Sequence, residues 1–133
     1  MTTIQAQIWK GSRFSIDRRQ GKTPGTVIIR LSGHFTARDM YGSLTPLELR
    51  NMFESDVTLN QEPLTASIFD LTDVPYMDSA GIGMIVSHYV RCKSKGIRMI
   101  AVGLSPRVLQ LFEVTKMDSI IPRAATVDEA DVA

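Results

Sequence analysis

The stretch ASIFDLTDVPYMDSAGIGMIVSHYV, residues 66–90, shows the clearest secondary-structure pattern of the chain. Its first six residues, Ala66–Leu71, are mainly apolar and include isoleucine and phenylalanine, which is typical of a buried strand. The following residues, Thr72–Asp78, contain Pro75 and indicate a loop. From Ser79 onward, apolar residues recur at helical spacing, at Ile82, Ile85, Val86, Tyr89 and Val90. The stretch therefore predicts a strand, a loop and an amphipathic helix in that order.

Further apolar segments on both sides of this stretch predict more strands. Phe14 and Ile16 alternate with polar residues. The segments Val27–Leu31 and Ile97–Val102 are apolar except for one arginine in each. Ile120-Ile121 predicts a last, short strand. Residues 33–44 show no clear period and are expected to form a long connection.

Helix starts are marked by capping residues. Thr45 followed by Pro46 predicts a helix that continues to Val57, and Ser105 followed by Pro106 predicts a second one. Thr126, with Glu129 three residues later, predicts a short C-terminal helix. Gly96 is expected to end the helix that starts at Ser79. Because strands and helices alternate, the chain is expected to be an α/β domain with a small, mostly parallel sheet of four to five strands.

Composition excludes several classes of protein. The 133 residues suit one domain, and the net charge of +1 comes from scattered basic residues, so neither nucleic-acid binding nor membrane insertion is expected. The single cysteine, Cys92, excludes an internal disulfide, and its spacing from His34 and His88 does not suggest a metal site. Residues Met1–Lys10 lack the pattern of a signal peptide, which predicts a cytoplasmic protein. No cofactor is expected.

Three catalytic or ligand-binding motifs match residues 70–83 only in part. A hydrolase nucleophile elbow needs a glycine where Met77 stands, and a dinucleotide fingerprint needs a third glycine where Val86 stands. Asp70 could be a phosphoacceptor aspartate, but residues 31–34 supply no acidic pair to hold Mg²⁺. The chain is therefore not expected to be an enzyme.

A fourth interpretation assigns the chemistry to Ser79. A serine at a helix N-terminus lies beside backbone N–H groups and the positive end of the helix dipole, which favour an added phosphate. That phosphate would bring about −1.5 to −2 charges close to Asp73 and Asp78, enough to repel a partner. Gly81 and Gly83 have no side chains, so a partner's backbone could approach the first turn of this helix closely. The alternative interpretation is structural: Asp78 or Ser79 is an N-cap, and the glycines permit close packing.

The segment Asp78–Gly83, D-S-A-G-I-G, resembles the hallmark motif of the STAS domain, the family of bacterial anti-sigma-factor antagonists. Gly33 resembles the glycine that ends an early strand of the family, and Ser105-Pro106 with Leu111-Phe112 resembles a later conserved segment. The resemblance covers residues 13–130, which are expected to form the STAS domain after an N-terminal extension of residues 1–12. It implies helices packed mainly on one face of the sheet.

The resemblance also implies a mechanism. The unmodified antagonist of this family binds an anti-sigma factor that is a serine kinase, and the kinase then phosphorylates the serine matching Ser79, which ends binding. A PP2C-type phosphatase restores it. The expected partner-binding residues are Met77, Asp78, Ala80, Gly81 and Met84 near the serine, with Thr36 and Asp39 after the early strand.

The chain departs from the family pattern after Gly33. Thr36 stands where many members carry an acidic residue, Asp39 is a candidate substitute, and the following loop is long. Trp9, in the extension, is expected to pack against the sheet. Two other functions stay open: a STAS subunit of an ABC-type transporter complex, and a domain that senses a nucleotide or another small molecule.

Overall fold

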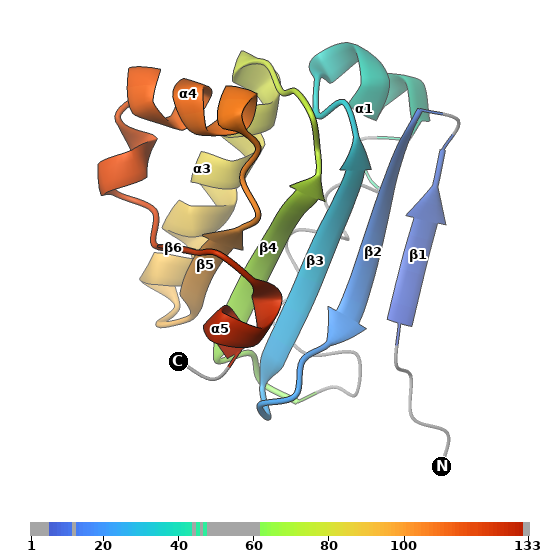
Figure 1. The fold of residues 1–133 in the computed structure, drawn as a ribbon. Coiled ribbons are helices and arrows are strands. Elements are labelled where there is room, and N and C mark those ends of the chain that lie inside the picture. Colours follow the sequence, from blue (N-terminus) through green and yellow to red (C-terminus); the bar gives the residue numbers. More distant parts are fainter. Residues whose placement is uncertain (1–5, 12, 44, 46, 48–61, 132–133) are drawn as a thin grey trace.

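The computed structural model describes residues 6–11, 13–43, 45, 47 and 62–131. Within them, one sheet holds all the strands (Figure 1). The strands are β1 (Ala6–Lys10), β2 (Phe14–Gln20), β3 (Thr26–Gly33), β4 (Ala66–Asp73), β5 (Arg98–Val102) and β6 (Arg123–Ala124). The helices are α1 (Ala37–Ser43), α3 (Ser79–Ser94), α4 (Pro106–Val114) and α5 (Val127–Asp131), with a 3₁₀ turn, η1 (Met117–Ser119).

The strands lie side by side in their order along the chain. β1, β2 and β3 form antiparallel pairs, whereas β3 to β6 pair in parallel. The α/β fold with a mostly parallel sheet is thus confirmed. The predicted four to five strands are too few, because Ala6–Lys10 adds an antiparallel edge strand within what we expected to be the N-terminal extension.

The main core lies between the sheet and α3. Alternate residues of β3 (Val27, Ile29 and Leu31) are buried in the same cluster as Ile82 and Ile85 of α3. On this side, the His88 ring of α3 stacks on Phe69 of β4, with 4.7 Å between ring centroids. The ring's Nε2 lies 2.8 Å from the Ser67 hydroxyl. Apolar burial and a satisfied buried histidine therefore fix α3 against β4.

A smaller core lies on the opposite face of the sheet, under α5. Ala130 of this helix packs with Ile68 of β4 and with Ile100 and Val102 of β5. The carboxylate of Asp131 is buried and accepts hydrogen bonds from the backbone N–H groups of Lys22 (2.6 Å) and Thr23 (3.1 Å). The short C-terminal helix is therefore held to the β2–β3 turn, while the longer helices pack mainly on the other face, as expected.

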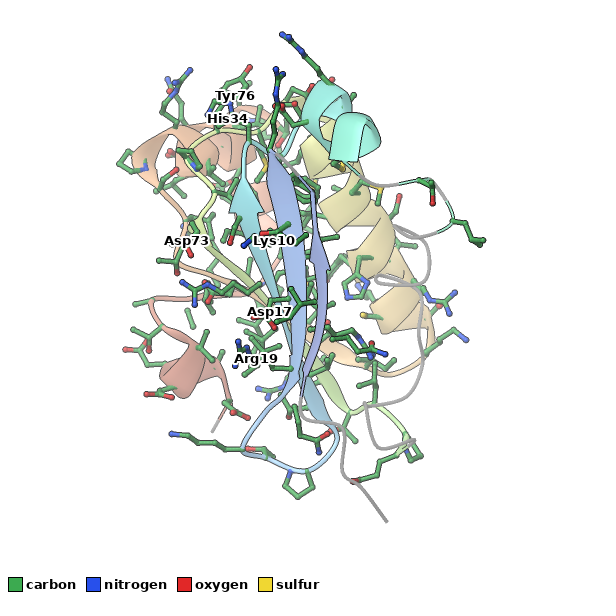
Figure 2. The ribbon with its side chains drawn as sticks, turned by 90° about the vertical axis from the view of Figure 1, so that its right-hand side faces the viewer. Lys10, Asp17, Arg19, His34, Asp73 and Tyr76 are labelled. Carbon is green, nitrogen blue, oxygen red and sulfur yellow. The ribbon has the colours of Figure 1, made fainter. Side chains whose placement is uncertain are left out.

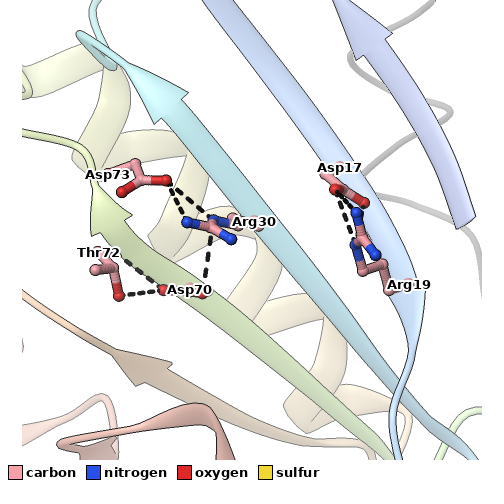
Figure 3. A network of polar contacts seen from close by, with 6 residues as sticks. All are labelled: Asp17, Arg19, Arg30, Asp70, Thr72 and Asp73. Atoms are coloured by element: carbon pink, nitrogen blue, oxygen red, sulfur yellow. Dashed lines mark hydrogen bonds and ion pairs between the residues drawn. The ribbon is translucent and has the colours of Figure 1, made fainter.

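The uncovered part of that second face carries ion pairs (Figure 3). The Arg30 guanidinium lies 2.5 Å from the Asp73 carboxylate and 4.0 Å from that of Asp70. Asp70 also accepts hydrogen bonds from the backbone and the hydroxyl of Thr72. A separate pair, Asp17 with Arg19, raises the pKa of Arg19 through a hydrogen bond and the neighbouring charge. Charged side chains of β2, β3 and β4 thus form local pairs on this face of the sheet.

Two sequence predictions are wrong. Ile120-Ile121 is not a strand: Lys116 takes the left-handed conformation (φ 66°), η1 follows, and the last strand forms only at Arg123–Ala124. Ile121 is apolar because it is buried in the main core. The connection over residues 33–44 contains α1.

Two further predictions fall outside the described part of the chain. They are the helix predicted from Thr45 to Val57, of which only Thr45 and Leu47 are described, and the packing of the Trp9 side chain.

Candidate functional site

The hallmark segment lies at the carboxyl ends of the parallel strands β3 and β4. After β3, Phe35 runs beside the loop that follows β4: its N–H donates to the Tyr76 carbonyl (2.9 Å), and its carbonyl accepts from the Asp78 N–H (3.4 Å). Ligand sites of α/β sheets form at this edge. The loop pairing fixes the backbone that leads into α3.

Asp78 is the N-cap of α3. Its Oδ1 accepts hydrogen bonds from the N–H groups of Ala80 (3.0 Å) and Gly81 (3.1 Å). Its Oδ2 accepts from the N–H of Ala37, at the start of α1 (3.3 Å). The carboxylate therefore ties two helix starts together. It also occupies two of the amides that the sequence analysis left for a phosphate.

The two glycines of the motif serve different purposes. A Cβ on Gly81 would lie 2.2 Å from the Phe35 carbonyl oxygen, so close packing requires glycine there. A Cβ on Gly83 would meet nothing within 4 Å. The structural interpretation therefore explains Gly81. Gly83 leaves a bare, exposed patch on the first turns of α3.

Ser79 is the first residue of α3 and its side chain is exposed. Among the other predicted contact residues near it, Asp78, Ala80 and Met84 are half-buried, whereas Met77 (3% exposed) and Gly81 are buried. Ser79 thus carries the accessible hydroxyl of this segment. Met77 and Gly81 are buried and support the backbone beneath it.

Thr36 and Asp39 form the start of α1. The Thr36 hydroxyl accepts from the Asp39 N–H (3.1 Å) and donates to the Asp39 carboxylate (2.8 Å), while the Thr36 carbonyl accepts from the Met40 N–H. Thr36 is buried (8% exposed) and Asp39 is half-buried, 4.0 Å from the Arg13 guanidinium. The departure from the family pattern at Thr36 therefore supplies a helix cap. The sequence signal for it, a threonine followed three residues later by an aspartate, was missed.

An open hollow of about 370 Å³ lies beside Ser79, between the start of α3 and one side of α4. Its lining residues are Tyr76, Met77, Asp78, Ser79, Arg107, Gln110, Leu111 and Val114. The Arg107 guanidinium lies over the Tyr76 ring, 4.7 Å from its centroid. The His34 ring also contacts the Tyr76 ring, with 5.9 Å between the centroids, and Figure 2 shows the two at the same end of the molecule. None of the α4 residues was expected from the sequence to contact a partner.

The position of α4 follows from two contacts with the loop after β4. The Ser105 hydroxyl caps α4 through the Val108 N–H (3.4 Å) and donates to the Val74 carbonyl (3.3 Å). Gly103, with a φ of 71°, lies so close to Thr72 that a Cβ would not fit. These contacts hold Arg107 near the start of α3.

The structure separates Asp70 and Asp73 from this hollow. Both pair with Arg30 on the open face of the sheet (Figure 3), and Asp73 borders a different hollow there. Asp73 therefore does not add its charge beside Ser79, contrary to the sequence analysis. Within the described residues, no three His, Cys, Asp or Glu side chains gather to hold a metal ion. None of the described helices has the length and apolar character needed to cross a membrane.

Comparison with known proteins decides the family. The family model described as "STAS domain" matches residues 17–130. The chain belongs to the STAS domain family. The anti-sigma-B factor antagonist of Listeria monocytogenes is 40% identical over 52 residues, which are 39% of this chain and 46% of that protein. That of Bacillus subtilis is 38% identical over 55 residues, 41% of this chain and 50% of that protein. The matched part thus spans about half the length of these curated relatives.

A solved structure supports the same fold. The crystal structure of an anti-sigma factor antagonist from Mycobacterium paratuberculosis superimposes with a TM-score of 0.69 at 15% identity. The match covers 88% of this STAS chain and 90% of that one. At this identity the likeness shows the STAS fold alone.

Proposed function

We propose that this STAS protein is a cytoplasmic anti-sigma factor antagonist that acts by binding, not by catalysis. In its unmodified form it binds an anti-sigma factor that is a serine kinase. Phosphorylation of Ser79 ends the binding, and a PP2C-type phosphatase restores it. The observation that carries the proposal is the exposed Ser79 at the first position of α3, directly after the N-cap residue Asp78. The names of the curated relatives support the same function.

The transfer itself requires only an accessible hydroxyl on this chain. The Ser79 oxygen attacks the γ-phosphorus of ATP bound to the kinase, the bond from that phosphorus to the β-phosphate oxygen breaks, and ADP leaves. The hydroxyl proton passes to a base of the kinase. This chain is therefore the substrate of the modification.

The local charges explain why a phosphate would end binding. The Asp78 carboxylate already accepts from the Ala80 and Gly81 amides, so these amides are not free to neutralise a phosphate on Ser79. The phosphate would add about −1.5 to −2 charges next to the existing carboxylate. Any partner packed over Ser79 would then have to desolvate this charge, which is costly. The switch thus works without a change of fold.

The partner surface is proposed to extend over both sides of Ser79. Asp78, Ala80 and Met84 contact the anti-sigma factor directly through their half-exposed side chains, as does Asp39 from α1. Met77, Gly81 and Thr36 contribute indirectly, because they hold the backbone of the two helix starts in place. The bare patch at Gly83 lets the partner's backbone approach α3.

The test incubates the chain with ATP and each serine-kinase anti-sigma factor encoded in the same genome, and locates phosphate by peptide mass spectrometry. Ser79→Ala should abolish the modification and keep the complex. Ser87→Ala is the matched control, since Ser87 is an exposed serine on the same helix, and it should behave as wild type. Phosphate on another residue, or no complex with any of these kinases, would overturn the proposal. A stable complex without phosphate would favour a non-switched adaptor, such as a transporter subunit.

A further inference from the structure

The hollow beside Ser79 has one cationic side chain among its lining residues, Arg107. The negative lining residue, Asp78, has its carboxylate occupied by three backbone N–H groups. Arg107 uses the face of its guanidinium against the Tyr76 ring. Within the described part of the chain, its edge N–H groups donate to no other residue. The hollow therefore presents a guanidinium, placed over the Tyr76 ring, whose edge donors make no hydrogen bond to the described residues.

The opposite part of the hollow is apolar. Val114, at the end of α4, is 74% exposed, and Leu111 lies half-buried one helical turn before it. Met77 lies at the base. A partner side chain packed over Val114 and Leu111 would remove apolar surface from water, which favours binding.

From this charge and shape we propose that the hollow binds a segment of the anti-sigma factor that carries a carboxylate next to an apolar side chain. The carboxylate pairs with the edge of the Arg107 guanidinium, which has the fork geometry that a carboxylate matches. The apolar side chain covers Val114 and Leu111. This inference rests on the proposed function and adds α4 as the element that selects the partner.

The test measures the affinity of purified variants for the anti-sigma factor that the wild type binds, using isothermal titration with unphosphorylated protein. Arg107→Glu reverses the charge and should weaken binding by about tenfold or more, as for close charge pairs at interfaces. Arg107→Lys keeps the positive charge but loses the forked geometry of the guanidinium. Its affinity for the anti-sigma factor should lie between those of the wild type and Arg107→Glu. Val114→Ser should weaken binding by about fivefold, as expected for an apolar side chain that is only partly covered.

Matched controls come from the other end of α3. Lys93 lies over the Tyr89 ring, 5.9 Å from its centroid, so Lys93→Glu removes the same type of contact and the same charge. It lies about 21 Å from Ser79 along the helix, at 1.5 Å per residue. Val90, 59% exposed on α3, is the control for Val114. Lys93→Glu and Val90→Ser should bind as tightly as wild type. Circular dichroism checks that every variant is folded.

The outcomes separate this inference from the function on which it rests. If the wild type binds no anti-sigma factor, the proposed function fails and the inference fails with it. If the wild type binds and Arg107→Glu binds equally well, the inference alone is overturned. Equal losses for Arg107→Glu and Lys93→Glu would also overturn it, since they would reflect net charge. Rescue of Arg107→Glu by a carboxylate-to-lysine change in the partner would support the pairing directly.

Discussion

Replacing Gly81 by alanine tests the packing that builds the site. The added Cβ would lie 2.2 Å from the Phe35 carbonyl oxygen and 3.0 Å from the Met77 Cβ. Ordinary contact begins at 3.4 Å, so the Phe35 backbone or α3 would have to move by 1.2 Å. That movement would disturb the hydrogen bonds that Phe35 makes with Tyr76 and Asp78. The obstacle is backbone, which cannot rotate away as a side chain can.

The change in the free energy of unfolding combines two destabilising contributions and one stabilising contribution. Overpacking costs about 1–3 kcal/mol, and each weakened backbone hydrogen bond costs about 1 kcal/mol. Alanine in place of glycine within a helix returns about 1 kcal/mol. Gly81→Ala should therefore lower the free energy of unfolding by about 2 kcal/mol. Gly83→Ala is the matched control on the same helix: its Cβ meets nothing, so it should raise that free energy by about 0.5–1 kcal/mol.

Urea unfolding followed by circular dichroism measures both variants. The midpoint of Gly81→Ala should fall and that of Gly83→Ala should rise, with the same dependence on urea as the wild type. If Gly81→Ala is as stable as Gly83→Ala, the Phe35 carbonyl does not press on α3, and our account of the site geometry is wrong.

Substitutions at three further residues test single side chains. Asp78→Ala should lower the free energy of unfolding by about 1–2 kcal/mol in urea titrations, because α3 loses its cap and α1 its link to it; an unchanged midpoint would contradict this. Asp131→Ala should cost about 2–3 kcal/mol in thermal unfolding, since two amides of the β2–β3 turn lose their acceptor; a stability like that of wild type would show that α5 does not hold this turn. Ser79→Asp should weaken binding to the anti-sigma factor in titration calorimetry while Ser79→Ala keeps it, because the first variant adds charge and the second removes only a hydroxyl; equal affinities would make Ser79 a structural residue.

Much of the fold could be predicted because its strongest signals are local. The apolar stripe of α3, the proline after Ser105 and Gly96 predict elements that the structure contains, and Gly96 takes the positive φ expected after a helix end. The α1 helix was missed because Ala37–Ser43 carries no apolar repeat, and its cap at Thr36 is its main local signal. The strand predicted at Ile120-Ile121 is absent. The apolar signal came from Ile121, which is buried in the main core without being part of a strand.

Of the residues that line the hollow, only those of the segment around Ser79 could be selected from the sequence. The sequence allowed either Asp78 or Ser79 to be the N-cap of α3, and the structure assigns the cap to Asp78 and leaves Ser79 exposed. Arg107 and Val114 could not be selected, because their importance depends on the approach of α4 to the loop after β4. That approach rests on the contact of Ser105 with Val74 and the close packing of Gly103 on Thr72, which residues far apart in the sequence make together.

The control of binding by Ser79 is tested by comparing two forms of the same protein. Unmodified chain and chain phosphorylated on Ser79 are each titrated against the anti-sigma factor in a calorimeter. Our account predicts a stable complex with the unmodified form and loss of binding with the phosphorylated form, while circular dichroism shows the same fold for both. Equal affinity of the two forms would contradict the account, since the exposed serine at the start of α3 would then not control the partner.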